Sequence, residues 1–396
     1  MNIAELKREL IEYSKTIGID KIGFTTAEPF TALRNRLIRQ QELQYQSGFE
    51  EKDIEKRVNP ALLMDGAQSI ISIALAYPSK MRIRVVSKKG ERRGIFCRAS
   101  WGTDYHIILK EKLQKLEEYI QAKVPEAKCK SMVDTGELAD RAVAERAGIG
   151  WSGKNCAIIT PEFGSFVYLG EMITTIPFEQ DEPIEEQCGT CNKCIEACPT
   201  EALVQGGQIN AQVCISFVTQ TKGFLAEFFR EKIGNRIYGC DTCQTVCPKN
   251  KGVDFHFHHE MEPNPETVKP LLKPILHMSN REFKAKFGHL AGSWRGKKPI
   301  QRNAIIALAH FKDESAREDL IQLLTSDSRP EIRGTAAWAL GEIGGEASLQ
   351  ALEEALEREK NEEVVAEIQQ GISFLNDRNN HYHDNEKHGL NLSSEK

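Results

Sequence analysis

The residues best suited to chemistry in this 396-residue sequence are cysteines, eight of which fall between positions 188 and 247. The first run, CGTCNKCIEACP (188–199), has the spacing C-x2-C-x2-C-x3-C-P. The second, CDTCQTVCP (240–248), lacks a leading cysteine, and Cys214 is free to complete it. Thiolates are soft anionic donors that suit iron, and eight is the number that two [4Fe-4S] clusters require.

The order of the two runs predicts which thiols share a cluster. In two-cluster ferredoxins, the last cysteine of each run binds the other cluster. We therefore expect a first cluster on Cys188, Cys191, Cys194 and Cys247, and a second on Cys198, Cys214, Cys240 and Cys243. Zinc is the alternative, since CxxC pairs also bind it, but the proline after the last ligand favours ferredoxin chemistry. The default for Cys97, Cys129 and Cys156 is a buried structural thiol.

A glycine-rich segment, GIGWSGKN (148–155), resembles a phosphate-binding loop and then departs from it. Asn155 stands where Ser or Thr would hold magnesium, and a predicted helix precedes the segment where a strand is required. Nucleotide hydrolysis is therefore not expected. The segment either cradles another phosphate or amide-bearing ligand or simply joins a helix to a strand.

Two acidic motifs allow both functional and structural interpretations. In VDTGELADR (133–141), Asp134 ends a predicted strand, where acids often face a ligand crevice. Asp134 and Glu137 also fit a helix capping box, which spacing alone favours. In RASWGTDYH (98–106), Asp104 is a plausible N-cap and His106 a residue at the start of a helix.

The elements that position these groups follow from hydrophobic periodicity. Helices are predicted at 3–16, 28–45, 104–121 and 137–148. Strands are predicted at 20–25, 69–77, 81–86 (beside 69–77) and 128–134, with further strands in NCAIIT and GSFVYLGEMITT. This alternation indicates an α/β domain over 1–178.

The rest of the chain predicts a multidomain α+β protein. The polar joint QDEPIEEQ (180–187) leads into a ferredoxin-like two-cluster domain, 179–260. The segment beginning at Ile300 repeats at Ile332, an offset of 32 residues that is typical of HEAT-like helix pairs. We assign 261–375 to a linker and these repeats, and expect the polar tail, 376–396, to be disordered.

Composition bounds the environment. The sequence has no apolar run near eighteen residues and no apolar segment at its charged N-terminus, so neither a membrane span nor a signal peptide is expected. Many cysteines in such a long chain favour metal or redox chemistry in a reducing cytoplasm. The net charge is -5, but the basic segments 80–93 and 288–303 offer local attraction to phosphates.

Taken together, the motifs resemble those of the epoxyqueuosine reductase family over about residues 1–375. The resemblance is carried by WGTDYH (101–106), VDTGELADRAVAERAGIGWSGKN (133–155), the two cysteine runs and CISFVTQTKG (214–223). It implies reduction of the epoxide of epoxyqueuosine, at the wobble position of tRNA, to the alkene of queuosine. This is the last step of queuosine formation. The implied cofactors are cobalamin and two [4Fe-4S] clusters, as in reductive dehalogenases.

The resemblance also implies roles for individual residues. Asp134 is the expected proton donor, with a pKa raised by a closed apolar pocket. The expected cobalamin contacts are Arg57, Cys97, Asp134, Ser152, Gly153, Lys154, Asn155, Ser216, Gln220, Thr221 and Asp241. The expected substrate and tRNA contacts are His106, Lys222, Arg295, Lys297 and Lys298. The D-x-H-x-x-G motif of a cobalt-ligating histidine is absent, and a monomer served by an unidentified electron donor is sufficient.

Two other functions compete with this one. The chain could be an electron-transfer or scaffold protein whose repeats dock a protein partner. It could instead be a cobalamin-dependent dehalogenase acting on small molecules. The two basic segments favour RNA over a small molecule.

Overall fold

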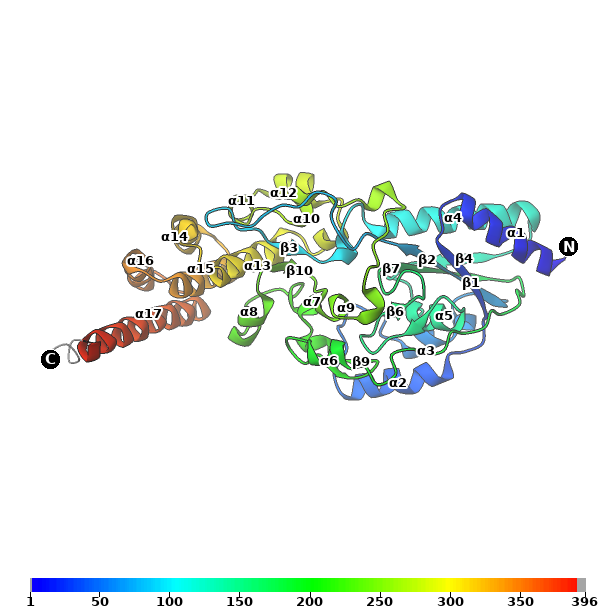
Figure 1. Cartoon of the computed structure of the whole chain (residues 1–396), viewed down its shortest axis with the longest axis horizontal. Coiled ribbons are helices and arrows are strands. Elements are labelled where there is room, and N and C mark those ends of the chain that lie inside the picture. The colour runs from blue at the N-terminus through cyan, green and yellow to red at the C-terminus, as the bar shows by residue number, and fades with distance from the viewer. Residues whose placement is uncertain (1, 390–396) are drawn as a thin grey trace.

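The computed structural model of the chain describes residues 2–389. Figure 1 shows an elongated molecule with a sheet near the N-terminus at one end and stacked helices at the other. The cysteine-rich segment lies between these two ends. Within residues 2–389, no helix is both long and apolar enough to cross a membrane.

The N-terminal domain is built on a four-stranded sheet of order β1-β2-β7-β4, antiparallel throughout. Its strands are β1 (Lys21–Thr26), β2 (Ser69–Ala76), β4 (Cys129–Met132) and β7 (Val167–Thr174). Its helices are α1 (Ile3–Thr16), α2 (Thr31–Glu42), α3 (Ile54–Val58), α4 (Tyr105–Lys123) and α5 (Asp140–Arg146). A short hairpin, β5 (Trp151–Ser152) with β6 (Ile158–Ile159), follows α5.

Helices cover the sheet on both faces, which explains the continuous apolar run of β2. Ile71 and Ile73 share a core with Leu10 of α1 and Leu109 of α4. Side chains alternate along a strand, so the neighbouring residue, Ile70, points to the other face, where it packs with Val143 of α5. All eight residues of β2 are buried in consequence.

The strand predicted at 81–86 is wrong. Both edges of β2 are already occupied, by β1 and β7, so no edge remains for a further strand to pair with. The segment instead crosses to the C-terminal part as a loop. Ile83 and Val86 are exposed, and Arg93 forms a β-bridge with Leu271.

The cysteine-rich segment consists of short elements. They are α6 (Lys193–Glu196), β8 (Leu203–Gln205), β9 (Gln208–Ile209), α7 (Ile215–Val218), α8 (Glu227–Ile233), β10 (Arg236–Tyr238) and α9 (Thr242–Thr245). Strand β10 pairs in parallel with β3 (Ile95–Phe96), so the segment is tied to the N-terminal domain by backbone hydrogen bonds.

The C-terminal part is helical. Its helices are α10 (Pro265–Val268), α11 (Lys273–His277), α12 (Asn280–Phe287), α13 (Lys297–His310), α14 (Arg317–Ser326), α15 (Pro330–Ile343), α16 (Glu346–Leu356) and α17 (Glu362–Gly389). The repeat seen in the sequence corresponds to α13 and α15. Small residues allow close helix contact, and a Cβ at Gly341 would meet the backbone of Gly371.

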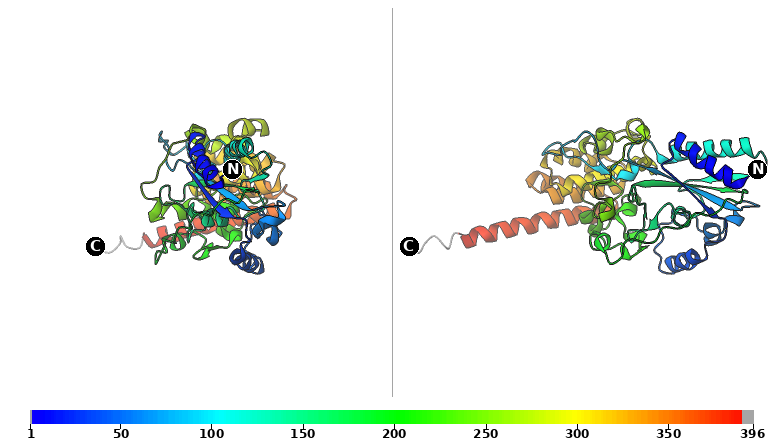
Figure 2. Two further views of the ribbon diagram at one scale, coloured as in Figure 1. Left: turned by 90° about the vertical axis from the view of Figure 1, so that its right-hand side faces the viewer. Right: turned by 45° about the vertical axis from the view of Figure 1, so that its right-hand side comes forward.

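The expectation of a disordered tail from 376 is wrong as far as the structure describes it. Helix α17 continues to Gly389 and projects from the body of the molecule (Figure 2). No proline or glycine follows Gly371 until Gly389, so nothing in the sequence interrupts the helix. Residues 390–396 lie outside the described part of the chain.

Candidate active site

Asp134 lies in a tight turn directly after β4. Its φ is +51°, and the N–H of Thr135 donates to the carbonyl of Val133 across the turn. An i to i+2 bond with positive φ defines a strained γ-turn. Helix α5 begins only at Asp140, with Ala139 as its N-cap. The capping interpretation of Asp134 is therefore wrong, and its side chain, 58% exposed, is available to a ligand.

His106 is held between two carboxylates. Its Nδ1 lies 2.7 Å from Asp104 Oδ1, and its Nε2 lies 3.4 Å from Asp134 Oδ2. Asp104 is the N-cap of α4, as expected, and accepts the backbone N–H of His106 at 3.0 Å. The same side chain that starts the helix thus orients the imidazole toward Asp134.

Tyr105 completes this group and was not singled out from the sequence. Like the imidazole of His106, its hydroxyl lies close enough to Asp134 to lower the pKa of that carboxyl. Its ring stacks on His106 (centroids 4.2 Å apart) and on Tyr168 (4.6 Å). Tyr105 lies inside the motif WGTDYH, so its position next to His106 was the available signal.

The charges of this group differ from expectation. The hydrogen bond to Asp104, and then the ion-pair contact with Asp134, raise the pKa of His106 to about 9. The contact with His106 lowers the pKa of Asp134. The expected raised pKa of Asp134 is therefore wrong, because a cationic partner outweighs burial. At neutral pH the imidazole of His106 carries the proton and Asp134 is an anion.

Cys97 and Asp241 lie where the N-terminal domain contacts the cysteine-rich segment. Cys97 is buried against Gly239, where a Cβ would clash with the sulfur. Burial raises the pKa of its thiol. The carboxylate of Asp241 accepts from the backbone N–H of Arg98 at 3.0 Å and from its guanidinium at 3.1 Å. Asp241 thus fixes the segment that carries Cys97.

The segment after Cys214 is held by the helical repeats. Arg302 of α13 donates to the carbonyls of Thr221 (2.9 Å) and Gly223 (2.8 Å), and Asn303 donates to that of Thr219 (2.8 Å). Both α13 side chains are buried. The first repeat helix therefore positions a segment of the site.

Side chains in this segment bond to its own backbone carbonyls and to two neighbouring aromatic residues. Gln220 donates to the carbonyl of Ser216 at 2.8 Å and accepts from the indole N–H of Trp294 at 2.8 Å. Its amide oxygen also accepts from the hydroxyl of Tyr238 at 3.4 Å. The hydroxyl of Thr221 donates to the carbonyl of Val218 at 2.9 Å.

The glycine-rich segment forms the turn of the β5–β6 hairpin. Ser152 donates to Glu145 at 2.9 Å, and Lys154 donates to the carbonyl of Gly189 at 2.6 Å. Lys154 therefore binds the first cysteine run. Asn155 is buried, and its Nδ2 finds no hydrogen-bond partner within residues 2–389. A buried donor without an acceptor is what a polar ligand at this turn would satisfy.

Arg57, another predicted cobalamin contact, lies on α3. It interacts with Glu50 and Asp140, and burial lowers its pKa. Asp140 accepts the backbone N–H of Asp134 at 3.1 Å. Arg57 therefore reaches the site through Asp140.

Several thiols predicted to share a cluster lie near one another. Cys194 is close enough to Cys247 and Cys188 for a thiolate at either to raise its pKa, although burial is the larger cause. These three belong to the first predicted cluster. The N–H of Cys191 donates to the carbonyl of Cys188 at 3.0 Å, which keeps the fourth member in the same loop.

The thiol of Cys214 lies near two members of the second predicted group. Burial raises the pKa of Cys214 to about 11, with further contributions from Cys240 and Cys198. Cys243 is raised by burial and then by Cys240, Cys214, Cys194 and Cys198, so the two groups adjoin. All eleven cysteines are free thiols. Within residues 2–389, no group of three or more His, Cys, Asp or Glu side chains is placed to hold a single metal ion.

Of the predicted tRNA contacts, Arg295, Lys297 and Lys298 lie at the start of the repeats, and Lys222 lies in the segment after Cys214. Lys222 is exposed, whereas Lys298 pairs with Glu331 at 2.6 Å. Lys297 donates to the carbonyl of Met278 at 2.7 Å. Arg295 lies over the rings of Phe49 and Trp294.

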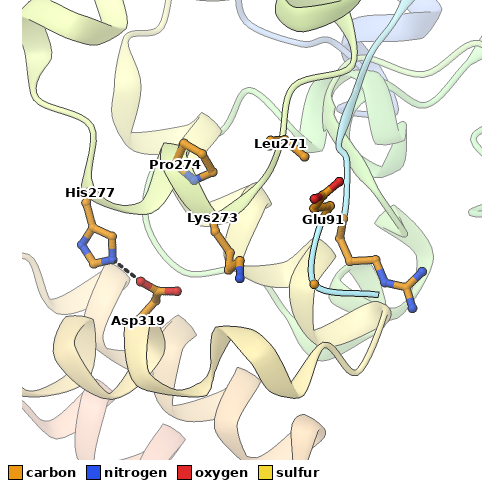
Figure 3. A pocket seen from close by; sticks show the side chains of 8 residues that line it. Glu91, Leu271, Lys273, Pro274, His277 and Asp319 are labelled. Carbon is orange, nitrogen blue, oxygen red and sulfur yellow. Dashed lines mark hydrogen bonds and ion pairs between the residues drawn. The ribbon is translucent and has the colours of Figure 1, made fainter. Parts of the chain in front are cut away.

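The basic segment 80–93 is largely ion-paired. Four of its seven basic residues lie within ion-pair distance of a carboxylate, namely Arg82, Lys88, Lys89 and Arg93. Its turn at 90–92 lines a pocket of about 400 Å³ with Lys273 and the bonded pair His277–Asp319 (Figure 3). None of the predicted cobalamin residues lines this pocket.

Fold and site define an oxidoreductase with two cluster-binding groups of thiols, an acid–base group at a strand end and HEAT-like repeats. Family models agree in detail. "Epoxyqueuosine reductase QueG, DUF1730" matches 57–135, "4Fe-4S double cluster binding domain" matches 187–250 and "HEAT repeats" matches 295–373. The zinc interpretation is thereby set aside.

Whole-chain relatives give the particular family. Epoxyqueuosine reductases from Bacillus anthracis and Bacillus subtilis are 68% and 67% identical over 375 residues, covering 95% of this chain and 99% and 97% of theirs. The chain belongs to the epoxyqueuosine reductase family.

Solved structures agree. A crystal structure of epoxyqueuosine reductase with an epoxyqueuosine-modified tRNA-Tyr stem loop has a TM-score of 0.93 and 67% identity, over 95% of this chain and 100% of that one. Another, from Bacillus subtilis, has the Asp134 catalytic loop swung out of the active site (TM-score 0.93, 66% identity, 94% and 100% coverage). An electron carrier without chemistry of its own is therefore excluded.

Proposed function

We propose that this protein binds the anticodon stem loop of a tRNA carrying epoxyqueuosine and reduces the epoxide to the alkene of queuosine. The reaction consumes two electrons and two protons and releases the epoxide oxygen as water. The protein acts as a cytoplasmic monomer and receives its electrons from an unidentified donor. The carrying observation is the Asp134–His106 pair in a chain that also brings cysteine thiols together. A relative bound to such a stem loop supports the substrate.

The clusters are assigned to the two groups of thiols described above. Cobalamin is assigned to contacts with the hairpin turn, the segment after Cys214 and the Asp134 turn. The unpartnered Nδ2 of Asn155 fits a ligand rich in amide groups. When bound, cobalamin supplies the low-valent metal chemistry that side chains lack, with electrons received singly through the clusters.

The proton path starts at His106. Its imidazolium, within 3.4 Å of Asp134, holds a proton at neutral pH. Asp134 is the exposed member of the pair and is placed to pass that proton to the leaving oxygen. The loop movement described for the Bacillus subtilis relative supports a mobile acid at this position.

The RNA is assigned to the entry of the repeats. Single-stranded loops present unstacked bases, which proteins bind with aromatic rings and arginine planes. Phe49, Trp294 and Arg295 offer such groups next to Gln220, and Lys222 adds an exposed charge. Lys297 and Lys298 contribute less, because each already has a partner.

The test is turnover of a modified stem loop by the anaerobically reconstituted protein. We expect wild type to form queuosine, and Asp134→Asn to retain iron and cobalamin but lose turnover by about 100-fold or more. Asparagine tolerates the positive φ at this position. Asp65→Asn, at an exposed aspartate before β2, is the matched control. No conversion by fully loaded wild type would refute the function, and normal turnover by Asp134→Asn would refute the acid.

A further inference from the structure

Glu171 is a buried acid for which the reaction outlined above has no use. It lies in the middle of β7, opposite Met132 of β4 and Ser72 of β2, and is 1% exposed. Neither carboxylate oxygen meets a hydrogen-bond donor within residues 2–389. An ionised carboxylate buried in this way is strongly disfavoured.

The group that faces Glu171 is a second carboxyl, that of Asp140 at the start of α5. Two carboxyl groups in contact cannot both be ionised in a buried site, so they share one proton. Burial, and then the charge of Asp140, raises the pKa of Glu171 well above its usual range. Burial raises the pKa of Asp140 to about 6. Glu171 therefore keeps the proton and donates it in a hydrogen bond to Asp140.

Asp140 connects Glu171 to the active site. Its Oδ2 accepts the backbone N–H of Asp134 at 3.1 Å. Asp134 has a φ of +51° in a γ-turn, which an aspartate adopts only when surrounding groups hold it. The acceptor is thus part of what keeps the carboxylate of Asp134 near His106.

We propose that Glu171, buried in β7 and facing Asp140, is a positioning residue that holds the Asp134 turn in the conformation needed for proton transfer. The proposal rests on the proposed role of Asp134. Two contacts connect Glu171 to the active site. Glu171 on β7 orients Asp140 on α5, and Asp140 accepts the backbone N–H of Asp134 after β4. It acts through geometry alone and leaves the proton for the substrate with His106.

The arrangement depends on the protonation of both carboxyl groups. The pKa of Glu171 is raised, so Glu171 can donate to ionised Asp140 above the pKa of Asp140, about 6, and loses its proton as pH rises through its own pKa. Asp140 also faces Arg57, which favours the ionised form of Asp140, and Asp134, which disfavours that form. Arg141 and Glu50 are the charged groups around Arg57. Ionised Glu171 would repel Asp140 and release the turn.

The experiment compares Glu171→Leu with Glu171→Gln. Glutamine donates to Asp140 at any pH, whereas leucine fills the space without a donor. Met172→Leu, at the next buried position of β7, is the control for repacking. The measurements are hydrogen exchange of the backbone amides of 133–138 in the reconstituted protein, and kcat and KM for the modified stem loop across pH.

We expect Glu171→Leu to exchange faster at 133–138 and to lose about 10- to 100-fold in kcat with little change in KM, the effect of a misplaced reactive group. Glu171→Gln should restore most of the slow amide exchange at 133–138 and most of kcat. It should also remove the part of the decrease in kcat at alkaline pH that comes from ionisation of Glu171. Wild-type exchange in Glu171→Leu, or a Glu171→Gln variant as impaired as the leucine variant, would overturn the proposal. Exchange does not require turnover, so the contrast persists even if wild type fails to convert the stem loop.

Discussion

Replacing Asp104 with asparagine removes the charge that does most to keep His106 protonated. The hydrogen bond from His106 Nδ1 to Asp104, 2.7 Å long, is the largest cause of its raised pKa. Asparagine still caps α4, since its side-chain oxygen accepts the same backbone N–H. The substitution therefore changes charge while leaving the start of the helix intact.

The size of the effect follows from the pKa. Wild-type His106 titrates at about 9. Loss of one adjacent charge lowers a pKa by one to several units, and we expect about 7.5 in Asp104→Asn, because Asp134 still contributes. At pH 8 the protonated fraction falls from about nine-tenths to about a quarter, while at pH 6 both proteins remain almost fully protonated.

The assay is the pH profile of turnover, together with NMR titration of the His106 ring. We expect turnover by Asp104→Asn to be about fourfold lower at pH 8 and unchanged at pH 6, in proportion to the protonated fraction. The wild-type profile should fall only as pH rises through about 9. A wild-type His106 that titrates near 6.5, or a variant with an unshifted profile, would refute the assignment of the proton to His106.

Three further outcomes test other parts of the structure. Cys198→Ser should lower bound iron from about eight to about four atoms per chain, whereas Cys129→Ser, outside both groups, should retain about eight; equal loss in both would contradict the grouping. Glu367→Gln leaves buried Arg230 without its counter-charge and should lower the free energy of unfolding by about 3–5 kcal/mol in urea titrations, while an unchanged midpoint would show that the pair is not needed. Lys222→Gln should reduce the slope of stem-loop affinity against salt concentration by the equivalent of about one phosphate contact. Lys298→Gln should reduce this slope by less, because Glu331 already neutralises Lys298. The reverse order would argue against the proposed RNA surface.

Much of this protein could be predicted from local sequence patterns. The spacing of the cysteines identified both ligand runs, because adjacent ligands of one cluster come from one short loop. The 32-residue repeat located α13 and α15, because each repeat contains the same helix with the same buried positions. Asp104 was predicted as an N-cap for a similarly local reason, since a cap bonds to the residues that follow it.

Other features were decided only by the order of the strands. Residues 81–86 have the pattern of a strand, but β1 and β7 already occupy both edges of β2. The charge state of Asp134 depends on His106, which lies 28 residues earlier and reaches it only because α4 packs near the end of β4. Glu171 meets Asp140 because β7 lies beside β4 and is covered by α5. Spacing along the chain determines contacts within a helix or loop, whereas these pairings depend on which strands become neighbours, and that is settled only when the whole core packs.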